Sequence, residues 1–170
     1  MELELLHVIQ NLHTPFLDSV MVFLSRLGDH GMVWVAIAVL LLAGRKTRSC
    51  GIRMLVSMLV CLLVGNVFLK NWICRARPCW VDQSVKMLVD IPRDYSFPSG
   101  HTMHGFAAAV VLWFYDRKMG WIALALAAAI AFSRLYLFVH YPTDVLAGFC
   151  IGTITAMLVV WGANRRKHRI

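Results

Sequence analysis

Charged residues are scarce in this sequence. Only 15% of its 170 residues are Asp, Glu, Lys or Arg, whereas 59% are hydrophobic, and the mean hydropathy is +0.67. A soluble domain has about a quarter of its residues charged, so the composition argues against one. The apolar residues fall in blocks that approach the ~20 residues needed to cross a bilayer. We therefore expect a single all-α domain over residues 1–170, folded as a polytopic transmembrane helical bundle.

Two short signals are also missing. The first residues, Met1 to Glu4, lack the basic segment of a signal peptide, so the helices themselves are expected to direct membrane insertion. No CxxC pattern is present that would predict a zinc site, and we predict no metal and no other cofactor. Of the five cysteines, only Cys74 and Cys79 flank a polar loop, where they could pair in an oxidising compartment.

Five apolar runs predict membrane-spanning helices. They cover residues 32–44, 54–69, 102–115, 121–138 and 142–161. Residues 3–12 and 16–27 are apolar but interrupted by polar residues. We expect two short helices there, which lie at the membrane interface or enter the bilayer only partly. Alternatively, residues 1–27 form a sixth span.

The basic residues are distributed unevenly over the loops. Five spans place ten of the 17 Lys and Arg on one side of the membrane, namely Arg45, Lys46, Arg48, Arg53, Arg117, Lys118, Arg165, Arg166, Lys167 and Arg169. The positive-inside rule assigns that side to the cytoplasm. The net charge of +8 is therefore explained by orientation in a lipid bilayer, with no nucleic acid partner. Loops 71–100 and 135–141 are expected on the extracytoplasmic side of the cytoplasmic membrane.

Polar and charged residues concentrate in three segments that border the predicted spans. The segments are Lys70 with Arg77-Pro78, Pro98-Ser99-Gly100-His101, and Ser133-Arg134 with His140 and Asp144. Charge is costly in so apolar a chain, so its recurrence in the joining segments indicates a functional site. All three segments fall on the same predicted side of the membrane. Together they could hold a phosphate dianion, attack its phosphorus and protonate the leaving group.

The cations and the start of the third span suit an anion. Arg77 and Arg134 present planar forks that match two phosphate oxygens, and Lys70 adds a point charge. Ser99 is expected to be the N-cap of a helix, and Gly100 to allow close backbone approach, so that free amides complete an anion site. Simple explanations also exist, because Lys70 could be a snorkelling residue and Ser99 an ordinary cap.

The two histidines are the reactive candidates. A neutral His140 can attack phosphorus and form a phosphohistidine. Asp144 lies one helical turn further on and can fix the imidazole tautomer by accepting its other N–H. Asp144 would also suit the first turn of a helix that begins at Pro142. His101 would start protonated and act as the general acid for the leaving oxygen.

In chain order the three segments read K-x6-R-P, P-S-G-H and S-R-x5-H-x3-D. This pattern resembles the full signature of the type 2 phosphatidic acid phosphatase (PAP2) family. The resemblance implies a metal-independent membrane phosphatase in which His140 is the nucleophile, Asp144 orients it and His101 is the acid. It also implies that the phosphate is held by Lys70, Arg77, Ser99, Gly100 and Arg134.

The resemblance to small bacterial members of that family implies a membrane lipid phosphate as substrate. Undecaprenyl pyrophosphate, phosphatidylglycerol phosphate and phosphatidic acid all stay open. Arg75 and Arg93 could contact a second phosphate or a headgroup, although an exposed loop cation is a simpler explanation. Asp18 and Asp29 could shape the entrance of the pocket.

Three other functions are compatible with parts of the pattern. The two reactive histidines could bind zinc together with His104 and Asp144, although the surrounding cations would repel a divalent metal. The chain could instead be a non-enzymatic membrane scaffold or transporter, although the predicted spans contain few polar residues. A vanadium-dependent haloperoxidase would share the anion site, but the membrane setting and the small size argue against it.

Overall fold

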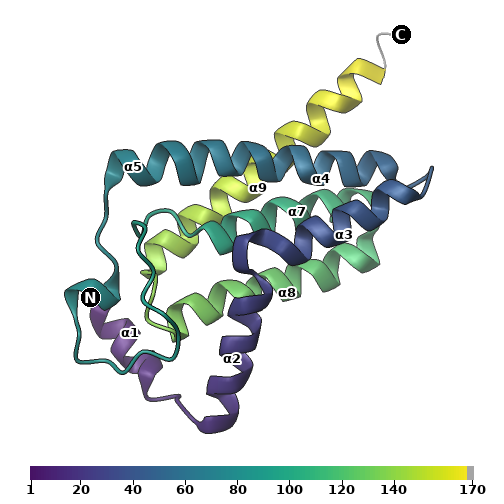
Figure 1. Cartoon of the computed structure of the whole chain (residues 1–170). Coiled ribbons are helices and arrows are strands. Elements are labelled where there is room, and N and C mark those ends of the chain that lie inside the picture. Colours follow the sequence, from purple (N-terminus) through teal and green to yellow (C-terminus); the bar gives the residue numbers. More distant parts are fainter. Residues whose placement is uncertain (168–170) are drawn as a thin grey trace.

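The computed structural model describes residues 1–167, and this part of the chain is helical, with no β-strand (Figure 1). The prediction of an all-α fold is confirmed. Residues 168–170, which include the predicted cytoplasmic Arg169, lie outside the described range. The elements in chain order are α1 (Glu2–Gln10), α2 (Pro15–Leu27), η1 (Asp29–Gly31), α3 (Met32–Ala43), α4 (Arg48–Cys61), the π-helical segment η2 (Leu62–Leu69), α5 (Lys70–Ile73), α6 (Pro78–Val81), α7 (Gly100–Tyr115), α8 (Arg117–Tyr136) and α9 (Pro142–Lys167).

A helix begins or continues in each of the five predicted apolar runs, but not all of these helices are long enough to cross a membrane. Three segments of the described chain qualify by length and composition, namely Arg48–Val81, Arg117–Tyr136 and Pro142–Ala163. Pro15–Leu27 and Asp29–Ala43 form a pair bent by 46° that would be a fourth, broken span. The structure therefore provides three or four candidate spans, and the count of five or six stays a prediction.

Helix α7 lies at the centre of the bundle, packed against α4, α8 and α9 (Figure 1). Its 16 residues reach only about 24 Å, less than the ~30 Å of a bilayer core. Ala107, Ala108, Ala109 and Val111 are fully buried. A helix that is apolar on all sides is expected in such an interior position, and small side chains let its neighbours approach closely.

Two glycines bring the beginnings of α7 and α9 together. A Cβ atom added at Gly148 would lie 2.7 Å from the carbonyl oxygen of Ser99, and one added at Gly152 would lie 2.3 Å from that of Met103. Their four-residue spacing is the small-xxx-small pattern that allows backbones of membrane helices to touch. The contact places the His140–Asp144 turn beside the first turn of α7.

Helices α1 and α2 lie at the same end of the bundle as the start of α9 (Figure 1). Helix α1 buries Leu6 and Ile9 in a cluster with Tyr136 and Phe138, and the Gln10 amide donates to the carbonyl oxygen of Tyr136 at 3.0 Å. The short N-terminal helices that we expected are therefore present. Helix α1 supports the turn that carries His140.

The basic turns lie at the other end of the bundle. The hydroxyls of Ser49 and Tyr115 are 2.8 Å apart, and the guanidinium of Arg53 lies 5.3 Å from the centre of the Tyr115 ring. These contacts join the start of α4 to the end of α7. Two of the three predicted cytoplasmic clusters are thus neighbours, and the end of α9 points in the same direction (Figure 1).

We expect Gly152→Leu to lower the free energy of unfolding in detergent by about 2 kcal/mol or more, because the side chain would force α9 away from the α7 backbone. Gly162→Leu is the matched control, since a Cβ atom there meets nothing within 4 Å. Thermal unfolding of both variants measures the difference. Equal stability of the two would contradict the close contact of α7 and α9.

Candidate active site

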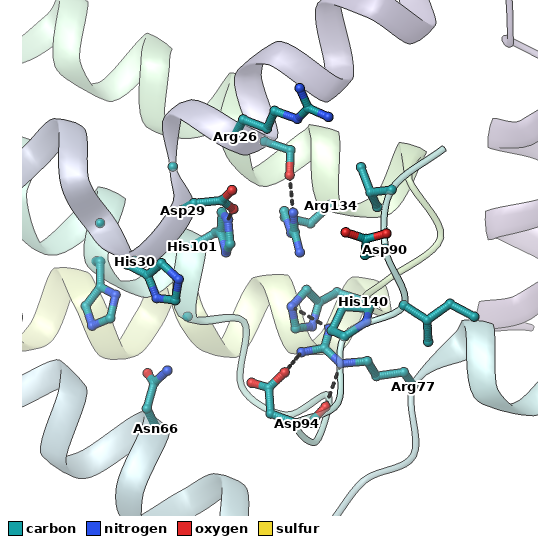
Figure 2. Close-up of a pocket in the computed structure, with 18 of the residues that line it drawn as sticks. Arg26, Asp29, His30, Asn66, Arg77, Asp90, Asp94, His101, Arg134 and His140 are labelled. Atoms are coloured by element: carbon teal, nitrogen blue, oxygen red, sulfur yellow. Dashed lines mark hydrogen bonds and ion pairs between the residues drawn. The ribbon is translucent and has the colours of Figure 1, made fainter. Parts of the chain in front are cut away.

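A cavity of about 890 Å³ lies where α2, α5, α7, α8 and the loop before α7 converge (Figure 2). Of the eight predicted site residues, six line it, namely Lys70, Arg77, Gly100, His101, Arg134 and His140. The other two, Ser99 and Asp144, are buried behind its wall. The structure therefore brings the three motif segments together around one hollow.

Three cations converge from separate elements. Lys70 begins α5, Arg77 is the N-cap of α6 with Pro78 in its first turn, and Arg134 lies in the last turn of α8. Their residues are only 5%, 2% and 6% exposed. Burying a charge costs several kcal/mol unless a partner of opposite sign compensates it. Three buried cations around one cavity therefore define a site for an anion.

Asp94 occupies part of this anion site. Its Oδ1 accepts a hydrogen bond from Arg77 Nη2 at 2.7 Å, and its Oδ2 accepts one from Lys70. Burial opposes ionisation of the Asp94 carboxyl, but Lys70 and Arg77 outweigh it and lower the pKa to about 2. Arg134 makes no such pair. It donates from Nη1 to Ser25, and its buried Nε has no partner.

His140 faces the cations with one ring nitrogen. Its Nε2 lies 3.2 Å from Arg77 Nη1, and since a guanidinium can only donate, Nε2 carries the lone pair. Its Nδ1 lies 3.4 Å from the hydroxyl of Ser96 and 3.5 Å from Asp144 Oδ2. Burial, together with the charges of the nearby cations, holds the pKa of His140 well below its usual range. The imidazole is therefore neutral, and its Nε2 lone pair is turned to Arg77 at the anion site.

Asp144 is fully buried and held by several donors. Its Oδ2 accepts from the Ser96 hydroxyl at 2.5 Å and from the Tyr141 amide at 2.8 Å. Its Oδ1 accepts from Arg75 at 2.7 Å. The predicted neighbourhood of His140 and Asp144 is present, but Ser96 and Arg75 also take part. Sequence reasoning did not single out Ser96, and it considered Arg75 as a contact of a second phosphate or headgroup or as a loop cation, not as a partner of Asp144.

Ser99 is the N-cap residue of α7, but its side chain makes no capping hydrogen bond. Its hydroxyl accepts from Thr102 Oγ1 at 3.0 Å, and its amide donates to the carbonyl oxygen of Asp144 at 3.1 Å. The Ser99 amide is therefore not free to bind phosphate, contrary to our expectation. Gly100 does line the cavity, where a Cβ atom would lie 3.1 Å from the Asn66 side chain.

His101 has a carboxylate partner. Its Nε2 lies 2.9 Å from Asp29 Oδ1 at the bend between α2 and α3 (Figure 2). Burial lowers the pKa of His101, and the Asp29 carboxylate opposes that shift because it favours the charged imidazolium. Gly28 permits the contact, because a Cβ atom there would lie 2.9 Å from His101 Cδ2. The sequence analysis had related Asp29 only to the entrance of the pocket.

Three further residues that the sequence analysis considered, His104, Cys74 and Cys79, take no part in the ion pairs described above. His104 lines the cavity, but residues 1–167 contain no group of three His, Cys, Asp or Glu side chains arranged to hold a metal ion. The positions of these side chains in residues 1–167 therefore give no support to the zinc alternative. Cys74 is exposed, Cys79 is buried, and both are free thiols, so the suggested disulfide is absent.

Comparison with known proteins agrees with this site. The PAP2 superfamily model matches residues 51–168. An undecaprenyl-diphosphatase of Sulfolobus acidocaldarius is 34% identical over 158 residues, covering 92% of this chain and 76% of that protein. The structure of a transmembrane PAP2-type phosphatidylglycerolphosphate phosphatase from Bacillus subtilis has a TM-score of 0.81 at 29% identity, covering 96% of this chain and 85% of that one. Aquifex aeolicus LpxE also gives 0.81 at 29% identity, covering 94% of both chains.

The helical fold and the buried cations beside two imidazoles define a hydrolase that acts on phosphate groups in a membrane. The chain belongs to the PAP2 superfamily. It is a lipid phosphate hydrolase, as its resemblance to that family implied.

Because the Asp94 carboxylate competes with phosphate for Lys70 and Arg77, Asp94→Asn should tighten inhibition by inorganic phosphate. Two partly exposed ion pairs stabilise by about 1 kcal/mol together, so the inhibition constant should fall about fivefold. Steady-state inhibition of the detergent-solubilised protein measures it. Asp90→Asn, which removes the same charge from another residue lining the cavity, should change the constant little. Weaker phosphate binding by Asp94→Asn would refute the competition.

Proposed function

We propose that this single domain removes a phosphate group from a membrane lipid through a phosphohistidine formed on His140. The site faces the extracytoplasmic side of the cytoplasmic membrane, and no metal or other cofactor takes part. The observation that carries the proposal is the orientation of His140, whose Nε2 lone pair faces Arg77 and the buried cations around it. A nucleophile and an anion site are thereby adjacent.

In the first step the phosphate group displaces Asp94 and binds Lys70, Arg77 and Arg134. His140 Nε2 attacks phosphorus, so that an N–P bond forms while the bond from phosphorus to the lipid oxygen breaks. His101 gives its proton to that oxygen, and Asp29 has stabilised the protonated imidazole beforehand. The cations are already in place when negative charge develops on the phosphoryl oxygens, which lowers the barrier.

In the second step water replaces the lipid product. His101, now neutral, accepts a proton from the water while its oxygen attacks phosphorus. The N–P bond of the phosphohistidine breaks, inorganic phosphate leaves, and His140 returns to its neutral form. Asp94 can then return to Lys70 and Arg77. Both imidazoles end in their starting states, so the cycle needs water as its only other reactant.

The substrate class follows from the relatives and from the position of the cavity. An undecaprenyl-diphosphatase and a phosphatidylglycerolphosphate phosphatase are among the similar proteins. The cavity lies at the ends of apolar helices. The end of a helix that spans the bilayer core reaches the headgroups, so a lipid chain could stay in the bilayer while its phosphate enters the cavity. The substrate is therefore the phosphomonoester or pyrophosphate of a lipid, such as undecaprenyl pyrophosphate, phosphatidylglycerol phosphate or phosphatidic acid.

The sidedness is supported by the distribution of basic residues. The turn after α3 and the α7–α8 junction are rich in Lys and Arg and meet through contacts of Tyr115. They lie at the end of the bundle opposite to the cavity. Basic turns are retained in the cytoplasm, so the cavity opens to the other side.

The enzyme proposal is tested with purified protein in detergent and a panel of these lipid phosphates. His140→Asn should reduce phosphate release by about 10³-fold or more, because a catalytic nucleophile is lost. Wild-type protein quenched during turnover of ³²P-labelled substrate should carry acid-labile, alkali-stable label, as a phosphohistidine does, and His140→Asn should not. The control is His7→Asn, a histidine paired with Asp82 outside the cavity. Lack of phosphate release by the wild type from every lipid would favour the scaffold or transporter alternative.

The orientation is tested through Cys74, which is exposed near the cavity end of the bundle. A membrane-impermeant maleimide should label this thiol in intact cells, and Cys74→Ser should abolish that label. The remaining exposed thiol, Cys150, lies in helix α9, and any label on it would persist in Cys74→Ser. Labelling of Cys74 only after the cells are opened would place the site in the cytoplasm.

A further inference from the structure

We propose that Arg75 and Glu2 are positioning residues that fix the Asp144 carboxylate beside the nucleophile. The inference rests on the proposed function of His140 and extends it to residues outside the three motifs. Arg75 lies in the loop between α5 and α6, and Glu2 lies in the first turn of α1. Neither residue lines the cavity, so neither is placed to touch the phosphate.

The guanidinium of Arg75 is held by four groups. Its Nη1 donates to Asp144 Oδ1 and to Thr143 Oγ1, both at 2.7 Å, and its Nη2 donates to Glu2 Oε2 at 2.6 Å. Its planar face lies 4.0 Å from the centre of the Tyr141 ring. A planar fork held by these four groups presents its donors in fixed directions, which a flexible ammonium would not do.

Asp144 needs this donor because of its burial. The carboxylate is fully buried, and its two oxygens have separate partners. Ser96 and the Tyr141 amide satisfy Oδ2, the oxygen next to His140 Nδ1, whereas the ion pair with Arg75 satisfies Oδ1. Loss of Arg75 would leave a buried anion without its counter-ion, which is strongly unfavourable. The carboxylate would then turn or take up a proton, and His140 would lose its orienting acceptor.

Glu2 fixes Arg75 in turn. Its Oε1 accepts from the amide of Thr143 at 3.1 Å and from the hydroxyl at 2.8 Å, while its Oε2 binds Arg75. Partial burial opposes ionisation, but the hydrogen bonds from Thr143 and Arg75 prevail and lower the pKa of Glu2. An anion at the N-terminal end of α9 also interacts favourably with the helix dipole. Helix α1 is therefore coupled, through Glu2 and Arg75, to the residue that orients the nucleophile.

The sequence had suggested another role for Arg75, in binding a second phosphate or a headgroup. The two roles differ in kinetics. A residue that orients the nucleophile affects kcat, whereas a residue that binds the substrate equally in the ground and transition states affects KM. The two roles also differ in their dependence on Asp144, because only a positioning residue acts through it.

The test uses the full chain in detergent with the lipid phosphate that it hydrolyses best. Arg75→Gln should lower kcat about tenfold, the effect of losing one charged hydrogen bond. KM and the inhibition constant of vanadate should stay within about twofold. Glu2→Gln should lower kcat less, and Arg75→Lys should recover part of the activity. In an Asp144→Asn background, Arg75→Gln should lower kcat by less than about twofold, because the effects of two coupled residues do not add.

Lys86→Gln is the matched control, since it removes an exposed cation between α6 and α7 that does not line the cavity. It should retain full activity. A rise of KM or of the vanadate constant in Arg75→Gln at unchanged kcat would overturn the proposal and assign Arg75 to substrate binding. Full additivity of Arg75→Gln with Asp144→Asn would overturn it as well.

A spectroscopic measurement separates this inference from the proposed function. The ¹⁵N resonance of His140 Nδ1 should shift in Arg75→Gln and stay unchanged in Lys86→Gln, whether or not the protein turns over a lipid. An unchanged resonance in Arg75→Gln would refute the positioning role. If the wild type hydrolyses no lipid phosphate, the proposed function fails, and the NMR comparison still decides the relation of Arg75 to His140.

Discussion

Repulsion between three buried cations is the physical constraint on which the rest of this structure depends. Lys70, Arg77 and Arg134 meet inside an apolar bundle, where like charges and lost hydration both oppose folding. The partly exposed carboxylate of Asp94 pairs with Lys70 and Arg77, and Arg134 Nε has no partner. A bound phosphate dianion would supply the missing negative charge. We therefore propose that phosphate binds because the fold maintains an excess of positive charge in the cavity.

The surrounding helices and turns fix the positions of the cations and of the two imidazoles. Helix α7 is short and buried, and the glycines of α9 let the two helix starts touch. The His140 turn is supported from outside by α1 and from inside by Asp144. Each imidazole has its own carboxylate: Asp144 lies at Nδ1 of the buried His140, and Asp29 lies at Nε2 of His101. Asp144 thus lies where it can fix the tautomer of the proposed nucleophile, and Asp29 lies where it can act as counter-ion to the proposed acid.

Much of this was predictable from the sequence because the motif residues are unusual in so apolar a chain. Lys70, Arg77, His101, Arg134 and His140 could be selected by type and spacing, and the structure brings them to one cavity. The partners of these residues could not be predicted from the sequence. The contacts of Arg75 with Asp144 and of Asp29 with His101 join residues about 70 positions apart. The sequence also does not reveal that α2 and α3 form a bent pair or that α7 is enclosed by neighbours. Hydropathy measures how apolar a segment is, and a helix surrounded by protein can be as apolar as a helix surrounded by lipid.

The most direct test of the account is an experimental structure with orthovanadate bound, because vanadate adopts the geometry of a phosphoryl group under attack. We expect vanadium bonded to His140 Nε2, oxygens on Lys70, Arg77 and Arg134, and the Asp94 carboxylate displaced from the cations. Vanadate bound elsewhere in the cavity, with Asp94 still paired to Lys70 and Arg77, would contradict the account.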